Sequence, residues 1–148
     1  MRQCTIRFLR PLAMVGGLLA VGVPMAALAP TTTLVSINSA GTGSGNGPSF
    51  IRKLSADGQV VAFQSLASDL VANDTNGAVA DIFVRDLKRG TTTLVSVNGA
   101  GTGSGNSDSF SSRLSADGQV VAIESSASDL VANDTNEEVQ DIFVRPIP

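Results

Sequence analysis

Residues 54–63 read LSADGQVVAF, and residues 114–123 read LSADGQVVAI. Each stretch places an Asp-Gly pair before a run of apolar residues. This pattern indicates two antiparallel strands joined by a tight turn, because both central residues of the favoured two-residue turn take a positive φ. The two stretches begin 60 residues apart.

The repetition extends in both directions from these stretches. Residues 31–88 align with residues 91–148 without a gap, and 42 of the 58 paired positions are identical. Self-similarity at a fixed period marks a structural unit that cannot bury its apolar face alone and stacks on copies of itself. We therefore divide the chain into residues 1–29, a first repeat over residues 30–90 and a second repeat over residues 91–148.

Each repeat contains four stretches with the composition of β-strands, separated by loops rich in Gly, Ser, Asn and Asp. In the first repeat these stretches are residues 31–37, 50–55, 59–65 and 81–87. Residues 60–63 are continuously apolar, as expected for a strand that is covered on both faces. No window after residue 29 shows the 3.6-residue periodicity of a helix, so the sequence predicts an all-β fold.

The fourth stretch has a clear alternation. It predicts that Ile82 and Val84 lie on one face of a strand, with Phe83 and Arg85 on the other. Four antiparallel strands per repeat, arranged in tandem, are typical of the blades of a β-propeller.

The residues also carry a family resemblance. The stretches 54–63 and 81–87 resemble the WD40-like (PD40) repeat of the TolB-type β-propellers, with its S-x-D-G-x-x-I-A-F and D-I-Y-V-x-D-L segments, and residues 114–123 and 141–145 repeat the match. The resemblance implies two tandem four-stranded antiparallel blades that serve as a binding platform. The N-terminal α/β domain of TolB has no counterpart in this sequence, so the role of TolB in the cell envelope is not carried over.

The number of blades departs from this family. Propellers typically close with 4–8 blades, whereas this chain has two repeats. In family order, residues 31–37 are the last strand of a blade, and Pro146 ends the final strand because it lacks a ladder donor. We expect the early strand to pair with the incomplete last blade of another copy, so that chains assemble into a ring. The alternatives are a truncated relic of a longer gene and a monomer with exposed sheet edges, which invites aggregation.

Residues 1–29 have the pattern of a secretory leader. Arg2, Arg7 and Arg10 precede an uncharged stretch over residues 12–29 that ends in Ala-Leu-Ala, the form of a signal-peptidase site. We therefore expect a periplasmic or extracellular protein. Pro30 fits a cleavage site poorly, which leaves an uncleaved membrane anchor as the alternative.

Without the leader the chain is acidic and contains no thiol. Removing three of the ten basic residues leaves seven against 13 acidic residues, a net charge of −6. Nucleic acid is not an expected partner, because phosphate contacts need a basic face. The single cysteine, Cys4, lies in the leader, so neither disulfide nor thiolate chemistry is expected. The expected partner is a protein or another copy of the chain, with no membrane contact after cleavage.

Each repeat contains one Asx-rich loop with the composition of a cation site. The candidate calcium ligands are Asp74, Asn76, Asp81, Asp134, Asn136 and Asp141. Carboxylate and amide oxygens are the ligands that Ca²⁺ prefers, but the spacing is one D-x-N pair short of the EF-hand pattern. The alternative is that these side chains bond their own backbone and shape a turn. Calcium is the only cofactor that the sequence suggests.

The sequence offers few groups for catalysis. It has no histidine, which excludes triads with an imidazole base and histidine-ligated zinc. Four aspartates of the first repeat recur 60 residues later, which is more typical of a scaffold than of an asymmetric acid–base pair. We predict a non-catalytic exported module that binds a protein partner or itself, with the rim loops at 41–49 and 101–109 as contact surfaces by fold analogy. The alternatives are a calcium-stabilised propeller fragment and an envelope hydrolase that uses carboxylates alone.

Overall fold

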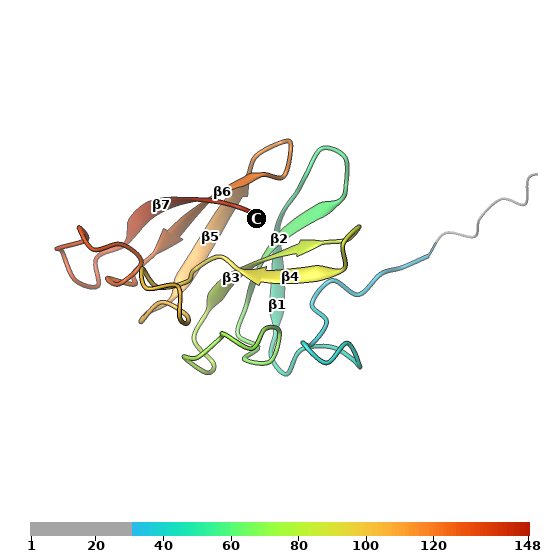
Figure 1. Cartoon of the computed structure of the whole chain (residues 1–148), viewed down its shortest axis with the longest axis horizontal. Coiled ribbons are helices and arrows are strands. Elements are labelled where there is room, and N and C mark those ends of the chain that lie inside the picture. The colour runs from blue at the N-terminus through green and yellow to red at the C-terminus, as the bar shows by residue number, and fades with distance from the viewer. Residues whose placement is uncertain (1–30) are drawn as a thin grey trace, which may run out of the picture. The chain divides into compact units, whose positions relative to one another are not determined.

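The computed structural model of the chain describes residues 31–148, so the expected leader and Pro30 lie outside the described residues. The described part contains seven strands and no helix (Figure 1): β1 (Ser49–Leu54), β2 (Val60–Ser65), β3 (Asp81–Asp86), β4 (Thr91–Leu94), β5 (Ser109–Leu114), β6 (Val120–Ser125) and β7 (Asp141–Pro146). Within this part no helix is long and apolar enough to cross a membrane.

The strands form two antiparallel sheets, in the order β1-β2-β3-β4 and β5-β6-β7. Neighbouring strands pair as simple hairpins, with Phe63 opposite Phe83 in the first sheet and Ile123 opposite Phe143 in the second. The all-β prediction is confirmed. The two sheets do not close into a ring, and the second has three strands where four were predicted.

The turn after β1 is longer than the predicted two residues. Five residues, 55–59, connect β1 to β2, and among them only Gly58 has a positive φ, of 72°. The carboxylate of Asp57 closes this turn by accepting hydrogen bonds from the Ser55 hydroxyl (2.6 Å) and the Gln59 backbone N–H (3.0 Å). The hairpin is confirmed, but its turn is longer than the two-residue form, and it is closed both by the Asp57 side chain and by backbone bonds from the Gly58 N–H to the Ser55 carbonyl (3.0 Å) and from the Ser55 N–H to the Val60 carbonyl (2.9 Å).

One short sequence adopts two different structures. Residues 31–34 and 91–94 both read TTTL, and residues 91–94 form β4 by pairing with β3. Residues 31–34 form no strand, and only an isolated bridge between Ile37 and Ser44 follows them. The strand predicted at 31–37 is therefore wrong. A strand needs a neighbouring edge to receive its ladder bonds, and no edge of the described sheets pairs with this segment.

Two apolar clusters stabilise the structure. The first joins the two repeats and contains Ala62, Ile82, Val84, Val95, Leu114, Val121, Ile123, Ala127 and Leu130. The second lies on the other face of the first sheet, where the rings of Phe63 and Phe83 stack with 5.7 Å between their centroids. The predicted alternation along β3 is thus confirmed, because Ile82 and Val84 belong to one cluster and Phe83 to the other.

Burial of the central strand differs between the repeats. In β2, Val61, Ala62 and Phe63 are all buried, as predicted for a strand covered on both faces. In β6 only Val121 and Ile123 of the corresponding apolar run are buried, while Val120 is exposed. The prediction holds for the first repeat alone, because only the first sheet has the second repeat packed against it.

Replacing Phe83 with Ala should lower the free energy of unfolding by about 3–5 kcal/mol, since a fully buried ring is lost from a stacked pair. The matched control is Phe143→Ala, at the same position of the second repeat, where the side chain is half-buried and faces Ile123. The decrease in the free energy of unfolding should be clearly smaller for Phe143→Ala than for Phe83→Ala. Urea denaturation of both variants checks this, and equal losses would contradict the difference in burial between the repeats.

Candidate functional site

The interface between the first sheet and the second repeat, here called the seam, is the contact that joins the two repeats. Strand β5 contacts β1, β2 and β3. Leu114 at the end of β5 and Val121 of β6 pack in one cluster with Ala62 and Val84 of the first sheet. At the seam, the face of the first sheet that carries Ala62 and Val84 packs against the opposite face of the second sheet, which carries Val121.

Hydrogen bonds cross the seam as well. The Gln64 side-chain amide donates to the Ser109 carbonyl (2.8 Å), and the Ser109 backbone N–H donates to the Ala80 carbonyl (2.7 Å). The Ala80 N–H in turn donates to the Asp108 carboxylate (2.8 Å). These bonds fix the register of the two repeats, because a shift along the sheet would leave buried polar groups without partners.

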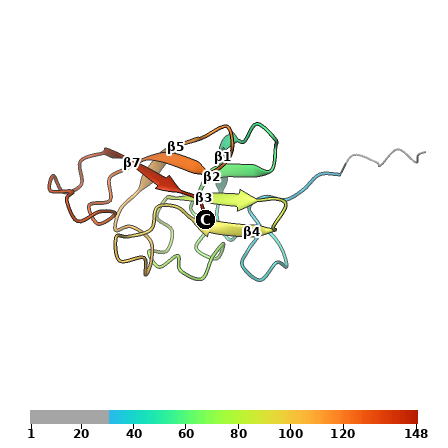
Figure 2. The ribbon, with the colours of Figure 1, turned by 45° about the horizontal axis from the view of Figure 1, so that its top comes forward.

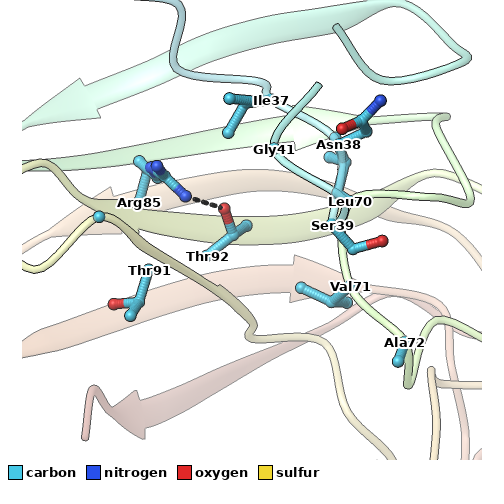
Figure 3. Close-up of a pocket in the computed structure, with 11 residues that line it drawn as sticks. Ile37, Asn38, Ser39, Gly41, Leu70, Val71, Ala72, Arg85, Thr91 and Thr92 are labelled. Carbon is cyan, nitrogen blue, oxygen red and sulfur yellow. Dashed lines mark hydrogen bonds between the residues drawn. The ribbon is translucent and has the colours of Figure 1, made fainter. Parts of the chain in front are cut away.

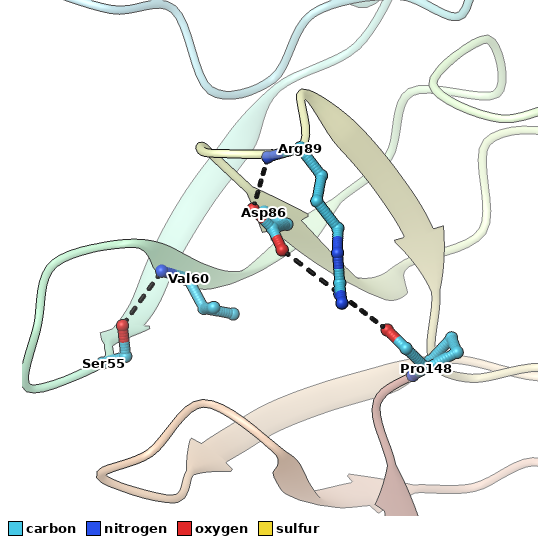
Figure 4. Close-up of polar contacts among 5 residues, drawn as sticks. All are labelled: Ser55, Val60, Asp86, Arg89 and Pro148. Carbon is cyan, nitrogen blue, oxygen red and sulfur yellow. Dashed lines mark hydrogen bonds and ion pairs between the residues drawn. The ribbon is translucent and has the colours of Figure 1, made fainter.

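The C-terminal residues add a further contact between the repeats. The Arg89 side chain, in the turn between β3 and β4, forms an ion pair with Asp86 (3.4 Å) and donates to the Pro148 carbonyl (3.3 Å), as Figure 4 shows. The same view shows the Val60 N–H donating to the Ser55 hydroxyl (2.9 Å) in the neighbouring hairpin. The end of the second repeat therefore contacts the β3–β4 hairpin of the first sheet through Arg89, and Figure 2 shows the C-terminus beside strands β3 and β4.

The corresponding face of the second sheet has no cover in the described residues. We call it the trailing face and define it by Val120, Ile142 and Val144. Ile142 is 75% exposed and Val144 is 67% exposed, whereas Ile82 and Val84 at the same positions of the first repeat are 0% and 1% exposed. Identical residues in identical strands differ only because the first repeat has a neighbour.

Strand β1 of the first sheet is here called the leading strand. No other sheet of the described chain covers it. All but the first residue of β1 are exposed, whereas Ser109, Ser112 and Leu114 of β5 are buried at the seam. Leu54 is 46% exposed and Leu114 is 6% exposed. β1 thus occupies the position in the first sheet that β5 occupies in the second, without a sheet packed on it, although the register shift of β1 lies between Ile51 and Lys53 and that of β5 between Ser109 and Ser111.

The trailing face also ends in a free edge. β3 pairs with β2 on one side and with β4 on the other, but within residues 31–148 β7 pairs only with β6. The backbone groups on the outer side of β7 can therefore accept another strand. In the first sheet that position is occupied by the TTTL sequence of β4.

The structure brings the first three calcium candidates together at the seam. Asp81 is fully buried at the start of β3, and its Oδ1 accepts a hydrogen bond from the Ser96 hydroxyl (2.5 Å). Asp74 Oδ1 accepts a hydrogen bond from the Ser104 hydroxyl (3.0 Å), and Asn76 Nδ2 donates to the Gly105 carbonyl (3.0 Å). All three partners belong to the second repeat.

Burial is the main electrostatic effect on these carboxylates. It raises the pKa of Asp81 to about 7; the side chains of Ser96, Asn76 and Ser104 lower this pKa, and the negative charge of Asp74 adds to the rise. Burial also raises the pKa of Asp74, against a lowering by its hydrogen bond from Ser104. The two acids therefore lie close enough to sense each other's charge in a poorly solvated place.

The second three candidates form a different arrangement. Asn136 Nδ2 donates to Asp141 Oδ2 (2.8 Å), and Asp134 accepts a hydrogen bond from the Asn136 backbone N–H (3.4 Å). These residues line an open hollow of about 300 Å³ beside Ile142. Among the described residues no hydroxyl donates to Asp134 or Asp141, whereas serine hydroxyls of the second repeat donate to both carboxylates of the first triad.

The predicted rim loops also differ from each other. The loop at 101–109 takes part in the seam, where the Ser104 hydroxyl accepts a hydrogen bond from the Thr75 N–H (3.1 Å). Both loops fold back on their own repeat, because the Asn46 N–H donates to Asp69 and the Asn106 N–H donates to Asp129 (2.9 Å each); the loop at 101–109 contacts the other repeat in addition. The loop at 101–109 therefore binds the first repeat. The sequence did not identify Ser104 as a site residue, because its partners, Thr75 and Asp74, lie about 30 residues earlier in the chain.

A hollow of about 370 Å³ lies beside the β3–β4 hairpin (Figure 3). Arg85 Nη1 donates to the Thr92 hydroxyl (3.0 Å) at its wall, and Ile37 and Leu70 supply apolar surface. Arg85 is the only ionisable residue in this lining. Among the described residues no three His, Cys, Asp or Glu side chains cluster as a metal site. The hollow therefore presents no nucleophile paired with a base.

Comparisons with known proteins found no matching family model, no matching curated protein and no matching solved structure.

The seam predicts unequal effects for one substitution at equivalent positions. Leu114→Ala should lower the free energy of unfolding by about 2–5 kcal/mol, because a buried leucine between the repeats is truncated. Leu54→Ala, its counterpart on the exposed leading strand, should cost far less. Chemical denaturation of the dilute protein measures both values. A larger loss at Leu54 would show that the seam is not where the repeats pack.

Proposed function

We propose that this chain is an exported, non-catalytic binding module whose partner is another copy of itself. In the proposed assembly the leading strand of one copy packs on the trailing face of the next, in the way that β5 packs on the first sheet. The observation that carries the proposal is the exposure of Ile142 and Val144, which are buried at the same positions in the first repeat.

The apolar contact of such an assembly has a template within the chain. The seam joins Ala62, Ile82 and Val84 to the second repeat, and the trailing face presents Ala122, Ile142 and Val144 at the same positions. Burying a large aliphatic side chain contributes about 1.5–3 kcal/mol. Two such residues on the trailing face, with Leu54 on the leading strand, supply a substantial part of the free energy that association requires.

The free edge of β7 supports the same arrangement. Residues 31–34 repeat the sequence of β4 but form no strand in the described chain. Added to β7 of another copy, they would occupy the place that residues 91–94 occupy beside β3. Strand addition satisfies the open backbone groups of both partners and removes an exposed edge.

Charge is complementary at the positions where the repeats differ. Ser112, buried at the seam, corresponds to Arg52 on the leading strand, and Gln64, whose amide crosses the seam, corresponds to Glu124. The loop before β7 also gains Glu137 and Glu138 in place of Gly77 and Ala78. Within the chain the Arg52 guanidinium donates to Gln64 Oε1 of its own sheet, so on association this arginine would exchange that bond for one to the acidic face of another copy.

Such a contact joins two different surfaces, so it produces a ring if the rotation closes and a filament if it does not. The resemblance to TolB-type repeats favours a ring, because propellers typically contain 4–8 blades. Three or four copies of a two-repeat chain would supply six or eight sheets. The strand order of the first sheet is compatible with a propeller blade.

The proposal predicts a discrete multiple of the chain mass in light scattering, with dissociation on dilution. Ile142→Arg should weaken association by about 10- to 100-fold, because it removes an aliphatic group and places a charge on the apolar face. Its circular dichroism should be unchanged. The control, Ala100→Arg, lies on an exposed turn and should associate normally. A well-folded monomer at all concentrations of the unsubstituted chain would exclude the proposal.

Glu124→Gln and Arg52→Ser should each weaken association and make it less dependent on salt. Each substitution replaces a charged residue with the uncharged residue found at the same position of the other repeat. If the two side chains meet across the interface, the double variant should be no weaker than the poorer single variant. Dissociation constants at low and high salt test this coupling. Fully additive losses would mean that the two charges do not interact.

A further inference from the structure

Four buried oxygen atoms at the seam have no hydrogen-bond partner among the described residues, and three of them belong to the first Asx-rich loop and the start of β3: Asp74 Oδ2, Asn76 Oδ1 and Asp81 Oδ2, the fourth being Ser112 Oγ. The Asp81 side chain is 0% exposed, and its other oxygen is occupied by Ser96. Buried acceptors in native proteins nearly always have a partner, so a group of three needs an explanation. Asp74 and the Asn76 side chain both lie close enough to Asp81 to act on its carboxylate, so a cation bound among the three side chains would supply the missing partner.

We propose that Asp74, Asn76 and Asp81 form a calcium site between the two repeats. The site lies within one chain, so this inference does not depend on association between chains. Ser96 and Ser104 of the second repeat orient the two carboxylates through their other oxygens.

The main alternative, that these side chains only shape their own loop, does not account for the contacts. Asp57 shows what turn-shaping looks like here, since its carboxylate accepts from Ser55 and Gln59 within two residues. Asp74 and Asp81 instead accept from serines 30 and 15 residues away. Each still keeps one buried oxygen unpaired. Turn formation explains neither the distant partners nor the orphaned oxygens.

The donor set selects the class of cation. It consists of carboxylate and amide oxygens, with no imidazole or thiolate, which favours a hard cation over zinc or copper. Two carboxylates balance the charge of a divalent ion. Calcium accepts 6–8 oxygen ligands in variable geometry and takes water for the remainder, whereas Mg²⁺ demands a near-ideal octahedron that a loop of this kind does not impose.

A cation at this position would also relieve an electrostatic cost. Two carboxylates that are buried near each other disfavour ionisation, and a divalent ion reverses this by stabilising both charges. Because the serines that orient the carboxylates come from the second repeat, the ion would hold the repeats together. Calcium should therefore raise the thermal stability of the whole compact unit over residues 32–148.

The second triad does not share the defining feature. The Asn136 amide already donates to Asp141 Oδ2, and of these three side chains only Asp134 has a buried oxygen without a partner. We therefore assign the site to the first triad alone.

The test is calcium titration of the full chain after removal of metal with EDTA. Calorimetry with CaCl₂ should show saturable binding, and the melting temperature should rise with CaCl₂ and much less with MgCl₂. The double variant Asp74→Asn, Asp81→Asn should lose both responses. If that variant does not fold, Asp74→Asn alone, on the half-buried loop residue, should weaken binding by about 10-fold or more.

The matched control is Asp117→Asn, which changes an exposed aspartate in a hairpin turn of the second repeat. It should keep the full response to calcium. The inference is overturned if CaCl₂ produces neither heat nor a melting shift in the unsubstituted chain. It is equally overturned if the double variant responds as strongly as the unsubstituted chain, since calcium would then bind elsewhere.

Discussion

A β-sheet has two faces and two edges, and the structure of this chain follows from which of them another segment covers. Ile82 and Ile142 occupy equivalent positions in β3 and β7, yet one is fully buried and the other is mostly exposed. The residue, the strand and the register are the same, so the difference comes only from the neighbouring repeat. A single sheet of this size cannot bury its own apolar residues, and pairing with a second sheet covers only half of them.

The seam combines three kinds of contact that depend on one another. Apolar packing of Leu114 against the first sheet excludes water, which raises the cost of every unpaired polar group nearby. The bonds made by Gln64 and Asp108 then set the register. The same exclusion of water makes Asp74 and Asp81 unusual, because carboxylates that would be solvated on an isolated sheet become buried when the second repeat packs.

The two repeats differ in sequence on the surfaces whose surroundings differ between the repeats. The apolar residues that form the seam are retained on the trailing face, whereas Glu124, Glu137 and Glu138 are found only in the second repeat and Arg52 only in the first. Charges at the border of an interface affect orientation and selectivity more than affinity. This distribution suits the proposed end-to-end contact, because an acidic face would repel a second acidic face and attract the basic leading strand.

The sequence by itself determined the all-β class, the 60-residue repeat, the hairpin at Asp57-Gly58 and the alternation along β3. These features depend on local turn chemistry and on the alternation of side chains between the two faces of a strand, and both can be recognised within a few residues. Only the tertiary structure decided that residues 91–94 form a strand while the identical residues 31–34 do not. It also decided that Asp74 and Asp81 meet Ser104 and Ser96. Strand pairing and burial depend on a partner distant in the chain, and identical segments cannot reveal which of them has one.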